Sequence, residues 1–176
     1  MKKYKLHTNY KQILADTITP VSVYLKIRDK FPNSILLESS DYHANDNSFS
    51  YICFNPIATI KVENQKIETN FPDGFSEIIP IDTEVNVAKE IENFSNQFET
   101  EKSEFKFITQ GLFGYLAYDA IQYFEKVSIE KKSTENEIPE IFYAVYQNII
   151  AINHFKNEAY LFCHSFDGSN NIGEIE

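Results

Sequence analysis

Apolar and polar residues alternate along much of this chain, which is the pattern of half-buried β-strands. Strands are predicted at residues 4–8, 34–39, 49–54, 58–63, 66–70, 111–118, 141–154 and 159–164. The strand at residues 34–39 is expected to be buried, and the last two are rich enough in aromatic and β-branched residues to be central. The pattern therefore predicts a mainly antiparallel, twisted sheet.

Helical patterns interrupt these strands. Thr19 can cap a helix that starts at Pro20 and ends before Phe31, because proline suits the first helical turn. Over residues 84–98 the apolar positions step by four and three, so they share one stripe of an amphipathic helix. A short third helix is expected to be capped by Asp119. The first two helices should pack outside the sheet, giving an α+β fold.

Polar segments separate the elements and suggest the turns. The strands at 58–63 and 66–70 should form a hairpin around Asn64-Gln65, although the favoured glycine is missing. The last two strands should turn at Lys156-Asn157, which would pair His154 with Ala159. Residues 41–47 and 126–137 have the composition of loops.

Size and charge limit the classes of function. A chain of 176 residues favours one domain, expected over residues 1–166, with residues 167–176 as a linker or frayed end. The net charge of −10 argues against nucleic acid as a partner. No apolar stretch fits a signal peptide or a membrane span, so a cytoplasmic protein is expected, with Cys53 and Cys163 as buried free thiols.

Residues with catalytic chemistry form no convincing constellation. The four histidines have no repeated ligand spacing, so no metal site is expected. Residues 39–43 include Ser39, Ser40, Asp41 and His43, the residue types of a hydrolase triad, but a local polar turn explains them better. Gly111 and Gly114 lack the rest of a phosphate-binding loop and are interpreted as sites of close backbone packing. The residues alone indicate a domain without a catalytic site.

Four motifs in order carry a family resemblance. Residues 36–39 read Leu-Leu-Glu-Ser and residues 50–56 read Ser-Tyr-Ile-Cys-Phe-Asn-Pro, a pair that resembles segments near the start of anthranilate synthase large subunits (component I). Residues 111–119 resemble that family's glycine-tyrosine-aspartate segment, and residues 143–154 resemble its next strand. The resemblance extends over residues 19–162, so the chain is similar to the N-terminal region of these subunits.

The resemblance implies a parent enzyme, a lyase of tryptophan biosynthesis. It converts chorismate and ammonia to anthranilate and pyruvate with Mg²⁺, and the ammonia comes from glutamine through a glutamine amidotransferase subunit (component II). Its catalytic residues and Mg²⁺ site belong to a C-terminal chorismate-binding domain that follows this region. The chain alone should therefore be inactive and hold no cofactor, and its sheet should form part of a larger two-sheet sandwich.

The resemblance also implies feedback inhibition by L-tryptophan, with an effector site at Leu37, Glu38, Ser39, Ser48 and Ser50. A carboxylate can bind the ligand's ammonium, and a serine hydroxyl adds a directional hydrogen bond. One departure concerns Ser48 and Phe49, which stand where many relatives have an arginine and an aromatic residue. Asn47, Ser48 and Ser50 could supply neutral hydrogen bonds instead, or Lys61 could reach across.

Two other functions fit the same residues. One is the N-terminal region of a sibling enzyme that uses chorismate, such as aminodeoxychorismate synthase component I. The other is a non-enzymatic interaction module whose aromatic sheet docks a partner and binds no small molecule.

Overall fold

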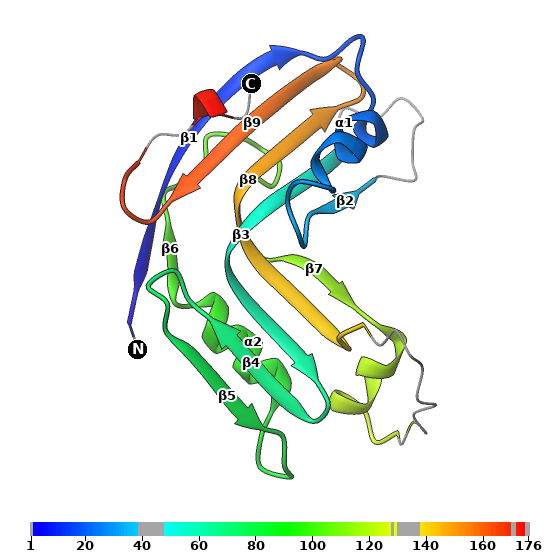
Figure 1. The fold of residues 1–176 in the computed structure, drawn as a ribbon, viewed down its shortest axis with the longest axis vertical. Coiled ribbons are helices and arrows are strands. Elements are labelled where there is room, and N and C mark those ends of the chain that lie inside the picture. The colour runs from blue at the N-terminus through cyan, green and yellow to red at the C-terminus, as the bar shows by residue number, and fades with distance from the viewer. Residues whose placement is uncertain (1, 39–47, 128, 130–137, 170–171, 175–176) are drawn as a thin grey trace.

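The computed structural model describes residues 2–38, 48–127, 129, 138–169 and 172–174 (Figure 1). Within these residues one mixed sheet has the strand order β5-β4-β3-β8-β9-β1-β6, while β2 pairs with β3 and β7 pairs with β8 beside this path. The strands are β1 (Tyr4–Leu14), β2 (Ile35–Leu37), β3 (Phe49–Glu63), β4 (Lys66–Asn70), β5 (Ser76–Pro80), β6 (Phe98–Thr100), β7 (Phe113–Leu116), β8 (Ile141–Asn153) and β9 (Glu158–Ser165). The helices are α1 (Pro20–Ile27) and α2 (Val87–Ser95), and two 3₁₀ turns are η1 (Tyr118–Tyr123) and η2 (Ile172–Glu174).

The long strands β3 and β8 pair antiparallel along most of their length and run through the whole sheet (Figure 1). Their register shifts between Pro56 and Ala58, next to Asn55 with its positive φ of 59°. Because this β-bulge bends the strand without ending it, the two strands predicted at 49–54 and 58–63 are one strand. The bulge divides the sheet into an upper half, where β2 and β9 flank the central pair, and a lower half, where β4 and β7 do so.

Helix α1 covers one face of the upper half, the α1 face. Thr19 Oγ1 accepts a hydrogen bond from Ser22 N at 3.2 Å, and Ser22 Oγ accepts one from Thr19 N at 3.3 Å, so the predicted cap is confirmed. Apolar residues of α1 pack there on Ile52 and Phe54 of β3 and on the neighbouring strands. The opposite face of the upper half, the aromatic face, carries a separate cluster around Tyr146 and Phe162.

Helix α2 covers the lower half and is shorter than the predicted 84–98. Asn86 caps its first turn by accepting a hydrogen bond from Lys89 N at 2.9 Å, and the helix ends at Ser95. Phe98, predicted as its last apolar position, lies instead in β6, where it pairs in parallel with Tyr4 and stacks on its ring at 5.6 Å. The sheet is therefore mixed at this edge, because β6 follows the direction of β1.

Several predicted elements differ from the observed ones. The strand at 34–39 was expected to be buried, but β2 has only three residues and Leu37 is 38% exposed. The strand predicted at 4–8 extends to Leu14, and the one predicted at 111–118 is reduced to β7. The short helix after it has Ala117, not Asp119, at its cap, with no side-chain hydrogen bond there.

The two predicted turns are present. Asn64 and Gln65 both have positive φ, 52° and 57°, as a two-residue hairpin turn requires. Strands β8 and β9 pair with Ile152 opposite Ala159, so the predicted pairing of His154 with Ala159 is wrong by two residues. His154 instead lies in the turn after β8. The loops predicted at 41–47 and at most of 126–137 lie outside the described residues.

The α+β class predicted from sequence is confirmed, with helices outside a mainly antiparallel sheet. The larger two-sheet sandwich concerns more than this chain and stays a prediction. Cys53 and Cys163 are both buried and neither is part of a disulfide, and burial raises the pKa of the Cys53 thiol. Among the described residues, no helix has the length and apolar character needed to cross a membrane.

Candidate functional site

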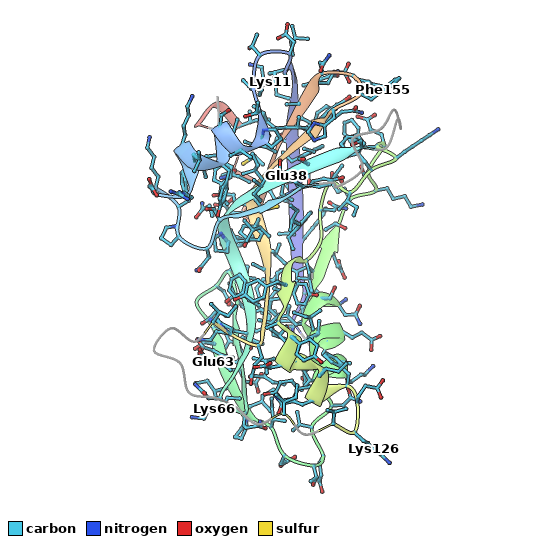
Figure 2. The ribbon with its side chains drawn as sticks, turned by 90° about the vertical axis from the view of Figure 1, so that its right-hand side faces the viewer. Lys11, Glu38, Glu63, Lys66, Lys126 and Phe155 are labelled. Atoms are coloured by element: carbon cyan, nitrogen blue, oxygen red, sulfur yellow. The ribbon has the colours of Figure 1, made fainter. Side chains whose placement is uncertain are left out.

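The described effector residues Leu37, Glu38, Ser48 and Ser50 belong to β2, to β3 and to the positions next to these two strands. Strand β2 pairs antiparallel with β3, and its last pair is Leu37 with Tyr51. Glu38 directly follows this pair along the chain, and Ser50 directly precedes it, two residues after Ser48. Figure 2 shows Glu38 in the upper part of the molecule. Ser39 lies outside the described residues, so its placement stays a prediction.

The sheet separates two of these residues. Ile35 of β2 packs on the aromatic face and Leu36 on the α1 face, so Leu37 follows Ile35 to the aromatic face. Ser50 lies two positions before Ile52 on β3, so the two side chains share a face. Because Ile52 packs on the α1 face, Ser50 lies on that face too. Leu37 and Ser50 therefore lie on opposite faces of the sheet.

Burial divides the candidates further. Glu38 is exposed, whereas Ser48 is buried and Ser50 is 0% exposed. The Ser50 hydroxyl lies 2.7 Å from Nε2 of His154, and the backbone carbonyl of Ser48 accepts a hydrogen bond from His154 N at 3.1 Å. Sequence reasoning missed His154 as part of this region, because it assigned the residue to a strand pair with Ala159.

Ser50 and His154 have the spacing of a nucleophile and its base, but a substrate cannot reach the Ser50 hydroxyl. A substrate cannot reach a serine side chain that is 0% exposed. We therefore interpret the contact as a hydrogen bond that holds the turn after β8 onto β3. The other triad-like residues, from Ser39 to His43, lie outside the described residues.

Lys61 does not reach the effector residues, so that suggestion from the sequence is wrong. It lies eleven positions after Ser50 on β3, which corresponds to about 36 Å of strand. Its Nζ lies 3.3 Å from Glu63 Oε2 and 3.2 Å from Glu68 Oε2. Figure 2 shows Glu63 and Lys66 at the opposite end of the molecule from Glu38.

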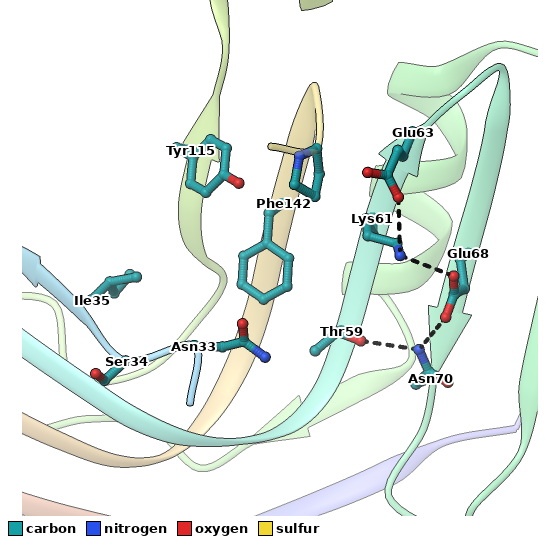
Figure 3. Close-up of a pocket in the computed structure, with 11 residues that line it drawn as sticks. Asn33, Ser34, Ile35, Thr59, Lys61, Glu63, Glu68, Asn70, Tyr115 and Phe142 are labelled. Carbon is teal, nitrogen blue, oxygen red and sulfur yellow. Dashed lines mark hydrogen bonds and ion pairs between the residues drawn. The ribbon is translucent and has the colours of Figure 1, made fainter. Parts of the chain in front are cut away.

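Lys61 belongs to a separate cavity of about 510 Å³ on the lower half of the sheet (Figure 3). One wall is polar and comes from β3 and β4, and the other is aromatic, with Tyr115 and Phe142 stacked at 6.1 Å. The cavity is lined by Asn33, Ser34, Ile35, Thr59, Lys61, Glu63, Glu68, Asn70, Tyr115, Pro139 and Phe142.

The polar wall of this cavity is paired within itself. Asn70 Nδ2 donates to Thr59 Oγ1 at 3.2 Å and to Glu68 Oε1 at 3.3 Å. Hydrogen bonds from Asn70 and from Lys61 lower the pKa of Glu68. Burial alone would lower the pKa of Lys61, but its hydrogen bonds to the two glutamates raise it. The network thus pairs Lys61 with two carboxylates of the chain itself.

The remaining histidines do not converge. His164 is buried in β9, with Nδ1 2.9 Å from Thr8 Oγ1, and burial lowers its pKa to about 4. His7 Nδ1 lies 3.5 Å from Glu101 Oε1 at the surface, and His43 lies outside the described residues. Within the part of the chain that the structure describes, no group of three or more His, Cys, Asp or Glu residues could hold a metal.

Comparison with known proteins identifies relatives. Residues 33–175 match the family model of the chorismate binding enzymes. Anthranilate synthase component 1 of Lactococcus lactis subsp. lactis is 31% identical over 86% of this chain and 31% of its own length. The protein of the same name from Bacillus subtilis is 29% identical over 79% of this chain and 26% of its own length.

A solved structure supports the fold. Anthranilate synthase component I from Streptococcus pneumoniae TIGR4 aligns with a TM-score of 0.54 and 20% identity, over 95% of this chain and 36% of that protein. The chain therefore spans about a third of the length of these relatives. The family match includes the residues assigned above to effector binding, so the division between an effector region and a chorismate region stays a prediction. Because the family model matches most of the sequence, this chain belongs to the chorismate binding enzymes.

Proposed function

We propose that this chain is the N-terminal, tryptophan-sensing region of an anthranilate synthase component I. The observation that supports the proposal is the position of Glu38, which is exposed and directly follows the last residue pair of β2 with β3, Leu37 with Tyr51. The motif at residues 36–39 and the named relatives support the same assignment. Residues 1–166 would form the sensing domain and residues 167–176 a linker.

The chemistry of an amino-acid effector suits Glu38. An exposed carboxylate at a strand end accepts a charge-assisted hydrogen bond from an ammonium group, which contributes about 1.5–3 kcal/mol. Micromolar binding requires about 8 kcal/mol. Glu38 alone cannot supply this free energy, so further contacts to the indole and the carboxylate must come from other residues.

The complete enzyme would perform the reaction. It would convert chorismate and ammonia to anthranilate and pyruvate with Mg²⁺, and a glutamine amidotransferase subunit would supply the ammonia. In this proposal the chorismate-binding domain contributes the catalytic residues and the Mg²⁺ ligands. The chain described here contributes the effector site and a surface that docks onto that domain.

The test is tryptophan inhibition of the complete protein that carries this chain, measured as anthranilate release from chorismate. Glu38→Ala should raise the tryptophan concentration for half inhibition by about tenfold or more, because it removes a hydrogen bond to a charged group. Ser39→Phe should do the same by filling the site. Glu77→Ala is the matched control, since Glu77 is an exposed glutamate on β5 in the lower half.

Two results would contradict the proposal. If both variants keep the sensitivity of the parent, the effector site lies elsewhere. If the parent releases aminodeoxychorismate instead of anthranilate, the chain belongs to the sibling enzyme.

A further inference from the structure

The cavity that contains Lys61 and Phe142, called the lower cavity, combines charged and aromatic side chains in one row across the sheet (Figure 3). Lys61 of β3 lies between Glu68 of β4 and Phe142 of β8 in the strand register. Tyr115 of β7 continues the row beyond Phe142. Residues paired directly across strands point to the same face, and strands are about 4.8 Å apart. The row therefore spans about 14 Å and presents both kinds of side chain to one space.

The loop before β2 forms another side of the lower cavity. The backbone carbonyl of Asn33 accepts a hydrogen bond from Tyr146 Oη at 2.7 Å, and that of Ser34 accepts one from Tyr24 Oη at 3.3 Å. Tyr146 is 0% exposed, so it holds the loop from within the core. The fold itself thus forms a cavity of about 510 Å³, which lies in the usual range of small-molecule sites, about 300–1,000 Å³.

The charges in the lower cavity favour a cationic ligand. The described residues that line it include two glutamates and one lysine, whose formal charges add to −1. Lys61 Nζ contacts both Glu63 Oε2 and Glu68 Oε2, so two carboxylates share one ammonium. A carboxylate has about four lone-pair sites, so Glu63 can accept a further donor. The formal charge of −10 on the whole chain also attracts cations rather than anions.

The aromatic wall lies within reach of this charge. Tyr115 and Phe142 stack with their ring centroids 6.1 Å apart. Burial raises the pKa of the Tyr115 hydroxyl, and the negative charge of Glu63 raises it further. Glu63 therefore acts on the aromatic wall as well as on Lys61. An aromatic ring attracts a cation to its face and packs well on another ring.

We propose that the lower cavity binds a small organic amine, in which an aromatic body carries one ammonium group. The ammonium donates to the carboxylate of Glu63, and the body packs on Phe142 and Tyr115. An anion of the same shape is disfavoured because it would meet two carboxylates and only one lysine. Figure 2 shows Glu63 at the opposite end of the molecule from Glu38. The inference therefore goes beyond the proposed function and does not rest on it.

The test compares four small molecules by titration calorimetry on the complete protein that carries this chain. Phenethylamine has the ammonium and the ring, 3-phenylpropionate replaces the ammonium with a carboxylate, 2-phenylethanol is neutral, and butylamine lacks the ring. Phenethylamine should bind about tenfold or more tightly than each of the others, because each lacks either the charged hydrogen bond or the ring contact.

Variants of the lining residues should act in opposite directions. Glu63→Gln should weaken phenethylamine by about tenfold and leave 2-phenylethanol unchanged. Lys61→Met removes the cation that the two carboxylates share, so it should strengthen phenethylamine. Tyr115→Leu should weaken phenethylamine and 2-phenylethanol alike, since both lose a ring contact. Glu77→Gln makes the same charge change on β5, outside the lining residues, and should change nothing. Thermal unfolding of each variant is the control for folding.

The outcomes are distinct. If phenethylamine does not bind, if it binds no better than 3-phenylpropionate, or if Glu63→Gln leaves its affinity unchanged, the inference is overturned. Displacement of phenethylamine by tryptophan also overturns it, because the amine would then occupy the effector site. Tryptophan inhibition of the complete protein tests the proposed function separately, and Glu63→Gln should leave that inhibition unchanged.

Discussion

Gly114 of β7 and Phe142 of β8 meet so closely that a Cβ atom on Gly114 would lie 1.9 Å from the carbonyl oxygen of Phe142. The neighbouring atom belongs to the backbone of a central strand, so it cannot move aside as a flexible side chain would. We predict that Gly114→Ala lowers the free energy of unfolding by roughly 3 kcal/mol, as overpacking does. Urea unfolding of the parent and the variant measures the difference.

Gly173→Ala provides the control, because no atom lies within 4 Å of a Cβ built there. Its free energy of unfolding should stay within about 0.5 kcal/mol of the parent. Equal stability of the two variants would show that β7 does not press against β8.

Phe94 anchors α2 to the lower half of the sheet. It is 1% exposed and packs between the rings of Phe71 and Phe98, each at 5.3 Å. Phe94→Ala should cost about 3–5 kcal/mol of unfolding free energy, because it leaves a cavity in the core. Phe155→Ala removes a ring of the same size from an exposed turn and should cost little. Chemical denaturation of both variants tests this, and similar losses would place Phe94 outside the core.

His164 should make stability depend on pH. Burial lowers its pKa from 6.5 to about 4. His164 of the folded chain therefore takes up its proton at a lower pH than His164 of the unfolded chain. Between these values the unfolded state holds more protons, and stability therefore falls as pH falls from about 6.5 to about 4. A shift of this size corresponds to about 3 kcal/mol.

The measurement compares unfolding at pH 7.5 and pH 4.5 for the parent and for His164→Asn. The asparagine amide can keep a hydrogen bond to Thr8 but does not titrate, while the carboxylates are common to both proteins. The parent should lose more stability on acidification than the variant. Parallel losses would show that the pKa of His164 is not depressed.

The isolated chain should bind L-tryptophan weakly, with a dissociation constant on the order of millimolar or higher. The reason is that one carboxylate supplies only part of the free energy of micromolar binding. The chain contains no Trp, so ligand emission can be followed directly over the Tyr background. The isolated chain should also release no anthranilate from chorismate, Mg²⁺ and ammonia. Steady turnover or micromolar binding would refute this division of roles.

Local patterns predicted the elements whose cause is local. The cap at Thr19, the turn at Asn64-Gln65 and the long strands β8 and β9 all follow from residues close in sequence. The end of α2 did not, because Phe98 satisfies the helical period as well as it satisfies a strand. Phe98 lies in a strand because it pairs with Tyr4, a residue far away in the sequence.

The candidate site shows the same limit. The motif at residues 36–39 pointed to Glu38, and the structure leaves this residue exposed directly after the last β2–β3 pair, Leu37 with Tyr51. Sequence reasoning could not find His154, because an error of two residues in the pairing of β8 and β9 removed it from the turn. It also could not exclude Lys61, since the ion pairs with Glu63 and Glu68 depend on the hairpin of β3 and β4. The location of His154 and the ion pairs of Lys61 both depend on the register between strands, which the composition of the sequence does not give.

The pairing of β1 with β9 determines when this sheet can be completed during synthesis. His7 pairs with Ser165, so β1 leaves the ribosome 158 residues before its partner strand. Synthesis adds about 5–20 residues per second, so β9 is made roughly 8–30 s after β1. During this time residues 7–14 lack the strand that they pair with in the folded chain, and they are open to chaperones or to misassembly. Translation speed between β1 and β9 should therefore affect the yield of folded protein more than translation speed before β1.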